Sequence, residues 1–258
     1  MGYPAKTARP NEGPDMPVSI GSSSPPEDRL RPSLAKDQYD PRGHLWPVVK
    51  ALLYLYRGLF VGRIRVLGRQ HIPPQPSIVV SNHAFASDAF VLAIVFGRLH
   101  ALAQVEIFAL PFFGWLLSRA GQIPVASDRG AEALARAAEQ LARGRSVLIY
   151  PEGRLSHGGQ MLQARTGAAR LSLSTQAPLL PVALYVPPRY GRLFRGRHFD
   201  RPTVVVWQIG GPCTVVIGEP WWPFAGRDPA SDGDIRSVAD EALARVQTLL
   251  EDARREAA

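Results

Sequence analysis

Cysteine is almost absent from this chain of 258 residues, in which Cys213 stands alone. A single thiol excludes an intramolecular disulfide and a multi-cysteine zinc site, which is consistent with a reducing compartment. No apolar run reaches the roughly 20 residues that span a bilayer, and the N-terminal residues lack the charged-then-apolar pattern of a secretory signal. We therefore expect neither secretion nor a transmembrane span, and we expect Cys213 to be a small buried side chain.

Acidic residues are also scarce. The 22 Asp and Glu residues face 30 Lys and Arg residues, which gives a net charge of +8 and an isoelectric point near 10.1. Such a balance favours an anionic partner: nucleic acid, an anionic lipid surface or a phosphorylated metabolite. No recognised nucleic-acid motif accompanies the charge, which disfavours nucleic acid, and the G-x-S-x-G elbow of many serine hydrolases is missing.

The chain divides into a tail and one domain. Residues 1–43 are rich in proline and lack apolar periodicity, so we predict a disordered N-terminal tail followed by a domain over 44–258. The apolar segment 45–62 carries a narrow polar stripe of Lys50, Tyr54 and Arg57, which predicts an amphipathic helix. This helix suits either the membrane interface or ordinary packing on the core, because the sequence does not reveal which side the domain covers.

Beyond this helix, strand and helix patterns alternate. Such alternation predicts an α/β fold with a largely parallel sheet flanked by helices. The predicted strands cover residues 77–81, 146–150, 179–186, 203–210 and 214–218, and the predicted helices begin after Ser87 and cover 131–142, 168–175 and 232–255.

Polar residues follow the first of these strands. In an α/β sheet the ligand site lies outside the carboxyl ends of the strands, where His83 falls. A neutral imidazole can take a proton from a hydroxyl near pH 7, and Asp88 can orient it if His83 lies in the loop and Asp88 in the first helical turn. The alternative is a helix capped by Ser87 or Asp88 after an unrelated loop histidine. No second ligand stands nearby at metal spacing, so we expect no metal.

A second strand end resembles the first. Strand 146–150 leads into Glu152 and Gly153, followed by a glycine-bearing loop with Arg154 and Arg165. Glycine permits close backbone approach, and arginine binds anions through charge-assisted hydrogen bonds. Glu152 could order these arginines, accept from a substrate hydroxyl, or cap the next helix.

Four sequence blocks carry a family resemblance. "NHAFASD" resembles the N-H-x4-D motif, and "YPEGRLS" the E-G-T-R-S motif, of the glycerolipid acyltransferases related to 1-acylglycerol-3-phosphate acyltransferase. "PFFGWLLSRAGQIPVASDRG" and "QAPLLPVAL" are similar to that family's intermediate and later blocks. Their order and spacing agree over roughly residues 46–220.

The resemblance implies a mixed sheet flanked by helices, with an active site at the cytoplasmic face of a membrane whose anionic surface the protein contacts. It implies His83 as general base, Asp88 as its orienting partner, and an acyl-CoA or acyl-carrier-protein thioester as donor, with no cofactor. The implied acceptor is a lysophospholipid, most often 1-acylglycerol-3-phosphate. The substrate-binding residues that the matched motifs imply are Phe85, Ala86, Arg129, Glu152, Gly153, Arg154 and Arg165.

Two departures from the family pattern leave the acceptor open. Arg154 and Leu155 stand where the family has Thr-Arg, and Arg129 comes two residues later than the family's arginine. Because those positions are associated with the acceptor's phosphate, the acceptor is either a phosphate-bearing or another lysolipid. The segment 189–201 interleaves five arginines with aromatic residues, which suits single-stranded nucleic acid or a lipid interface; we predict a solvated basic loop there.

Overall fold

The computed structural model describes residues 39–126, 128–156, 161–198, 201–224 and 231–257. These residues all belong to one compact unit, Leu34–Ala258. Most of the predicted disordered tail, residues 1–38, lies outside the described residues. The end of that tail is held against the domain, because Gln140 and Arg145 donate hydrogen bonds of 2.9 and 2.6 Å to the Pro41 carbonyl.

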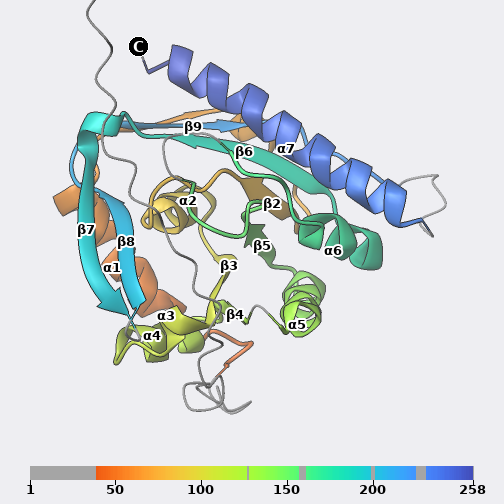
Figure 1. The fold of residues 1–258 in the computed structure, drawn as a ribbon, viewed down its shortest axis with the longest axis horizontal. Coiled ribbons are helices and arrows are strands. Elements are labelled where there is room, and N and C mark those ends of the chain that lie inside the picture. Colours follow the sequence, from red (N-terminus) through yellow and green to blue (C-terminus); the bar gives the residue numbers. More distant parts are fainter. Residues whose placement is uncertain (1–38, 127, 157–160, 199–200, 225–230, 258) are drawn as a thin grey trace, which may run out of the picture. The chain divides into compact units, whose positions relative to one another are not determined.

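A seven-stranded sheet forms the centre of the fold (Figure 1). Its order is β1-β9-β6-β2-β5-β3-β4, and every pairing is parallel except β6 with β9. The predicted mixed, largely parallel sheet is thereby confirmed. The strands are β1 (Ile64–Leu67), β2 (Ile78–Ser81), β3 (Leu99–Gln104), β4 (Ile123–Val125), β5 (Ser146–Ile149), β6 (Leu179–Tyr185) and β9 (Cys213–Ile217).

Helices cover both faces of the sheet. They are α1 (Trp46–Phe60), α2 (Asp88–Phe96), α3 (Val105–Phe108), α4 (Phe113–Arg119), α5 (Gly130–Ala142), α6 (Gly167–Thr175) and α7 (Asp232–Arg255), with short 3-10 turns η1 (Arg69–His71) and η2 (Pro188–Tyr190). Side chains alternate across a strand, so Ile78 and Val80 pack with α5, α6 and α7, whereas Val79 packs with α2 on the opposite face. None of the described helices is long and apolar enough to cross a bilayer.

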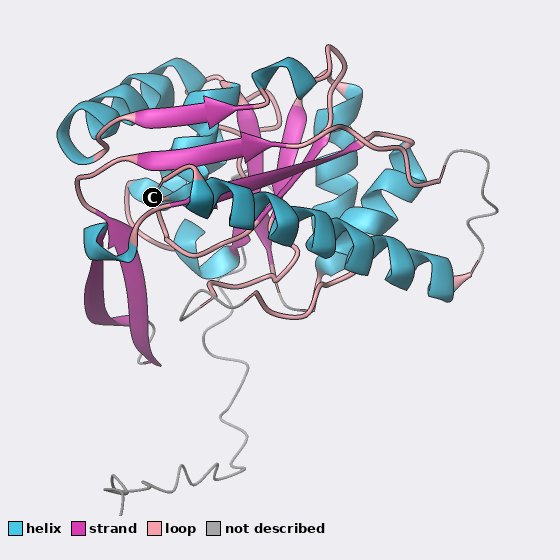
Figure 2. Ribbon diagram, turned by 90° about the horizontal axis from the view of Figure 1, so that it is seen from above, coloured by secondary structure: helices cyan, strands magenta, loops and turns pink. Residues whose placement is uncertain are grey.

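A separate two-stranded hairpin corrects one prediction. Strands β7 (Gly191–His198) and β8 (Arg201–Gln208) pair with each other, and Figure 2 shows them standing apart from the main sheet. The segment predicted as a solvated basic loop is therefore mostly a strand, since its register with the β-branched run of β8 overrides its polar composition. The hairpin packs on the α2 side of the sheet through Val206.

The N-terminal elements α1 and β1 bind segments that come late in the chain. Strand β1 pairs with β9, from Ile64 opposite Cys213 onward. The end of α1 is held by a nearby glycine pair: the Gly210 amide donates to the Phe60 carbonyl at 2.7 Å, and the Gly62 amide donates to the Gly211 carbonyl at 2.9 Å. Helix α1 is thus fixed by the turn that precedes β9.

Candidate active site

The carboxyl ends of β2 and β5 meet at one edge of the sheet because the two strands are parallel neighbours. Directly after β2, the buried Asn82 amide exchanges two 2.9 Å hydrogen bonds with the backbone of Leu184 in β6. The Asn82 side chain thereby extends the hydrogen-bonded pairing of β2 with β6 by one residue beyond the end of β2. Asn82 fixes the point at which the chain turns into the loop that carries His83.

Asp88 closes that loop from the first position of α2. Its Oδ2 accepts hydrogen bonds of 2.8 Å from the amides of both Ala84 and Phe85, and it lies 3.3 Å from His83 Nδ1. The side chain of Asp88 is only 1% exposed, so these donors stabilise a buried carboxylate. An Nδ1–H that donates to Asp88 leaves Nε2 of His83 as the proton acceptor.

Tyr150, which directly follows β5, supports the imidazole from one side. Its ring stacks on that of His83, with centroids 3.8 Å apart and planes 9° from parallel. The hydroxyl oxygen is buried and has no hydrogen-bond partner in the described part of the chain, and burial raises the pKa of Tyr150 well above its ordinary value. The stack restricts rotation of the imidazole, a role that the sequence analysis did not assign.

Glu152 binds the backbone on both sides of the site. One carboxylate oxygen accepts from the His83 amide at 3.2 Å, and the other accepts from the Leu162 amide at 3.0 Å. The residue is 3% exposed, and this burial raises the pKa of its carboxyl above the ordinary value despite the two donors. Among the described residues Glu152 neither pairs with an arginine nor caps α6. It instead links the loop after β2 to the loop after β5 through these two hydrogen bonds.

Ser156 also binds the backbone of His83. Its amide and its hydroxyl both donate to the His83 carbonyl, at 2.7 and 3.0 Å. The amide and the carbonyl of His83 are therefore both bound by the loop after β5. This serine belongs to the "YPEGRLS" block, but sequence reasoning gave it no role.

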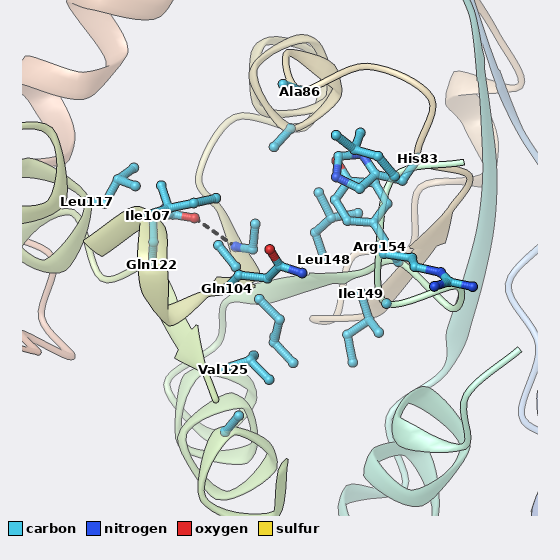
Figure 3. A pocket seen from close by; sticks show the side chains of 18 of the residues that line it. His83, Ala86, Gln104, Ile107, Leu117, Gln122, Val125, Leu148, Ile149 and Arg154 are labelled. Carbon is cyan, nitrogen blue, oxygen red and sulfur yellow. Dashed lines mark hydrogen bonds between the residues drawn. The ribbon is translucent and has the colours of Figure 1, made fainter. Parts of the chain in front are cut away.

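A cavity of about 1390 Å³ opens beside His83 (Figure 3). Five predicted site residues line it, namely His83, Ala86, Gly153, Arg154 and Arg165. The other four, Asp88, Phe85, Arg129 and Glu152, do not. Phe85 is 8% exposed with its ring in the core, and Arg129 is an exposed residue just before α5.

Four arginines of the described residues line the cavity. They are Arg154 and Arg165 of the loop after β5, Arg170 of α6, which also pairs with Asp232 at 3.1 Å, and Arg195 of β7. Gly153 permits this arrangement, because its φ is +67° and a Cβ there would lie 2.7 Å from Arg165 Nε. The wall can therefore bind an anionic group, and Arg195 comes from the basic segment 189–201, outside the four family blocks.

Most of the remaining wall is apolar, although Gln104, Glu106 and Gln122 also line the cavity. It is built by α1, α2, α3 and α4, through Trp46, Val49, Leu53, Phe90, Ile107, Leu110, Phe113 and Leu117. Figure 3 shows Ile107 and Leu117 across the cavity from Arg154, with His83 beside the arginine. The described residues contain no cluster of His, Cys, Asp or Glu able to hold a metal ion.

A His–Asp pair with a buried aspartate at the carboxyl ends of parallel strands, beside a cavity that is part cationic and part apolar, defines a candidate catalytic site for an amphiphilic anion. Residues 63–185 match the family model described as Acyltransferase, the family that the four sequence blocks resemble.

Curated relatives are similar to part of the chain. The chain is 33% identical over 125 residues to the 1-acyl-sn-glycerol-3-phosphate acyltransferase of Pseudomonas aeruginosa, covering 47% of this chain and 49% of that protein. It is 36% identical over 126 residues to the lyso-ornithine lipid O-acyltransferase of the same organism, covering 47% of this chain and 46% of that protein. The chain thus aligns with about half the length of these curated relatives.

A solved structure shares the fold. The crystal structure of the 1-acyl-sn-glycerophosphate (LPA) acyltransferase from Thermotoga maritima superposes with a TM-score of 0.61 at 21% identity, covering 84% of this chain and 81% of that one. The similarity extends beyond the residues that the family model matches.

Proposed function

We propose that this protein is an O-acyltransferase that moves a fatty acyl group from acyl-CoA or acyl-carrier protein to the free hydroxyl of a lysophospholipid. The observation that carries the proposal is the His83–Asp88 pair beside a cavity with cationic and apolar walls. The names of the relatives support the same chemistry. The favoured acceptor is 1-acylglycerol-3-phosphate.

The geometry suggests direct transfer. Nε2 of His83 removes the proton from the acceptor hydroxyl as its oxygen attacks the thioester carbonyl, forming a C–O bond. Asp88, at 3.3 Å from Nδ1, stabilises the developing imidazolium. The C–S bond then breaks, and the imidazolium returns its proton to the leaving thiolate. No acyl-enzyme and no cofactor are required.

The arginine wall supports an acceptor that carries phosphate. Arg154 and Arg165 lie on the loop that binds His83, and Arg195 adds a cation from the hairpin. A charge-assisted hydrogen bond contributes about 1.5 to 3 kcal/mol, so two or three such contacts would select a phosphate over a neutral headgroup.

A second acceptor class has its own support. Arg129, which the resemblance implied for phosphate binding, lies outside the cavity lining, and one relative is named as a lyso-ornithine lipid O-acyltransferase. An acceptor without a phosphate monoester is therefore the alternative within the same chemistry.

We further propose that the reaction takes place at the cytoplasmic face of a membrane, where acyl-CoA and acyl-carrier-protein thioesters are present. Helix α1 supports an interfacial position: Leu53 is buried against the domain, while Leu52, Leu55 and Leu59 are 43%, 57% and 65% exposed. An exposed leucine stripe on a surface helix is typical of interfacial binding.

The test is product identification. Purified protein is incubated with labelled acyl-CoA and a panel of lysophosphatidate, lyso-ornithine lipid and lysophosphatidylcholine. We expect acylated lysophosphatidate as the main product and a loss of about 10²- to 10⁴-fold in His83→Ala. His44→Ala, an exposed histidine paired with Asp40, is the control and should retain activity. Near-wild-type turnover by His83→Ala would rule out the mechanism.

A further inference from the structure

The loop between β2 and α2, which carries the catalytic pair, is bound by the β7–β8 hairpin as well as by the loop after β5. The Ala86 amide donates to the Val206 carbonyl of β8 at 2.8 Å, and the Gln208 amide donates to the Ser87 hydroxyl oxygen at 3.2 Å. Ser87 and Gln208 are both 0% exposed, so water does not compete for these hydrogen bonds. The end of β8 therefore lies alongside the two residues that precede Asp88.

The hydroxyl of Ser87 binds the hairpin and not its own helix. Ser87 stands at the N-cap position of α2, where a serine hydroxyl usually accepts from an amide of the first turn. Here the side chain makes no capping bond, and it is the Ser87 carbonyl that accepts from the amides of Phe90 and Val91, at 3.0 and 3.2 Å. The capping role that the sequence offered for Ser87 is therefore wrong for its hydroxyl.

Phe85 joins the same two segments through apolar contact. Its buried ring belongs to the same core cluster as Val206 of β8. Gly191, the first residue of β7, lies so close that a Cβ there would be 2.9 Å from Phe85 Cε1 and 3.0 Å from Val206 Cγ1. The base of the hairpin is therefore packed on the loop without room for one more methyl group.

Helix α1 holds the hairpin from another side. The Tyr56 hydroxyl donates to the Gln208 carbonyl at 3.0 Å. The Tyr56 ring contacts Phe90 of α2, and Phe90 contacts Trp207 of β8, with ring centroids 5.6 Å apart in each pair. The end of β8 is thus fixed to both α1 and α2.

The hairpin also forms part of the cavity wall. Its lining residues are Phe194 and Arg195 of β7 and Val205 and Trp207 of β8. One element therefore sets the position of a part of the substrate-binding wall and of the loop that ends at Asp88.

We propose that the β7–β8 hairpin positions the catalytic pair. By binding the two residues before Asp88, the end of β8 fixes this carboxylate, which in turn orients the His83 imidazole. Ser87 is the positioning residue, because its hydroxyl accepts from the hairpin and its main chain begins α2 next to Asp88. The inference rests on the proposed function and deepens it, since the hairpin side of the substrate-binding wall and the general base then keep one geometry.

The first measurement is steady-state kinetics of two variants of the full chain. Ser87→Ala removes the acceptor for the Gln208 amide, and Gly191→Ala forces a Cβ against the Phe85 ring. We expect each variant to lower kcat at least about tenfold with an unchanged KM for the acyl donor, because a misplacement of about 1 Å at a catalytic group can cost about a hundredfold. The two substitutions act by different means, so either one can refute the proposal if the other fails to fold.

Two matched controls lie away from the hairpin. Ser172→Ala removes a buried hydroxyl of α6 that donates to the Ala177 carbonyl at 2.8 Å, and Gly58→Ala adds a Cβ that would meet open space. Both should keep the wild-type kcat. Combined with His83→Ala, Ser87→Ala should cost no further activity, because Ser87 acts through the pair that the first substitution already disables. A loss by the same factor in both backgrounds would overturn the positioning role.

Hydrogen exchange tests the hold on the loop without any substrate. In the wild type the amides of Ala86 and Gln208 should exchange slowly and together. Ser87→Ala and Gly191→Ala should speed the exchange of both amides, whereas the two controls should not. Faster exchange with wild-type kcat would overturn the proposal, as would a lower kcat with unchanged exchange. If the wild type acylates no acceptor of the panel, the proposed function fails, and exchange alone then decides whether the hairpin holds the loop.

Discussion

Substitution of Glu152 can distinguish a residue that positions His83 from one that binds the acceptor hydroxyl. If Glu152 positions His83, its removal should lower kcat and leave both KM values nearly unchanged. If it bound the acceptor hydroxyl, its removal should raise the acceptor KM. We predict the first outcome, because its two oxygens already accept from the amides of His83 and Leu162 and the residue does not line the cavity.

The expected loss of kcat can be worked out from the two hydrogen bonds of Glu152. A hydrogen bond to a charged group contributes about 1.5 to 3 kcal/mol, so losing the His83 contact corresponds to about a ten- to hundredfold loss of kcat. Glu152→Ala leaves both buried amides without an acceptor and should show the full loss. Glu152→Gln keeps one carbonyl acceptor at the same length and should lose about tenfold or less.

The pH dependence of folding gives a second measurement. Burial raises the pKa of Glu152, so the folded state favours its protonated form. The wild-type free energy of unfolding should therefore be highest below the ordinary pKa of 4.5 and fall as pH rises through the raised value, relative to Glu152→Gln. Urea unfolding and steady-state kinetics of the three proteins test both points. A folded Glu152→Ala enzyme with wild-type kcat, or one whose only defect is a raised acceptor KM, would refute the positioning role.

Substitutions at four other positions test further features of the site and the fold. Arg154→Ala should raise the KM for lysophosphatidate about ten- to hundredfold and leave the donor KM unchanged, whereas Arg129→Ala, outside the cavity lining, should change neither; equal effects would refute the phosphate assignment. Tyr150→Phe keeps the stack on His83 and removes an unpartnered buried hydroxyl, so it should retain kcat and gain about 1 kcal/mol in unfolding free energy, while Tyr150→Leu should lose about tenfold in kcat. Burial lowers the pKa of His100 from 6.5 to about 4. The free energy of unfolding should therefore be highest above pH 6.5 and fall by about 3 kcal/mol as the pH drops toward 4. Urea titrations of His100→Asn should lack this pH dependence.

Sequence patterns identified the buried strands and the long helices. Strands β2, β5 and β6 have continuous β-branched or aliphatic runs, which is what a parallel sheet covered on both faces requires. Sequence patterns did not reveal β1, whose residues continue the apolar run after α1, or β3, whose sequence "LHALAQ" has little β propensity. Strand β4 carries a proline, and α3 is a single turn, so neither has enough residues to show a period.

The site was predictable where one short segment holds both partners. The five-residue spacing of His83 and Asp88 fits a loop followed by a helix, and the structure has that arrangement. The contact between Glu152 and His83 joins residues 69 apart, and no local pattern reports such a distance. Phe85 was expected to bind substrate, yet its ring is buried; nothing in "NHAFASD" tells which side of the loop an aromatic faces.

The pairing of β1 with β9 constrains the order in which the chain can assemble. The partners that hold the end of α1 and strand β1, namely the Gly210–Gly211 turn and β9, are made about 150 residues after β1. At about 5 to 20 residues per second, a ribosome needs roughly ten to thirty seconds to supply them. During that interval α1 has no place to dock through its final turn, so its leucine stripe is available to a membrane or a chaperone before the sheet is complete. The end of α1 is therefore among the last parts of the fold to be fixed in place, although α1 precedes every strand.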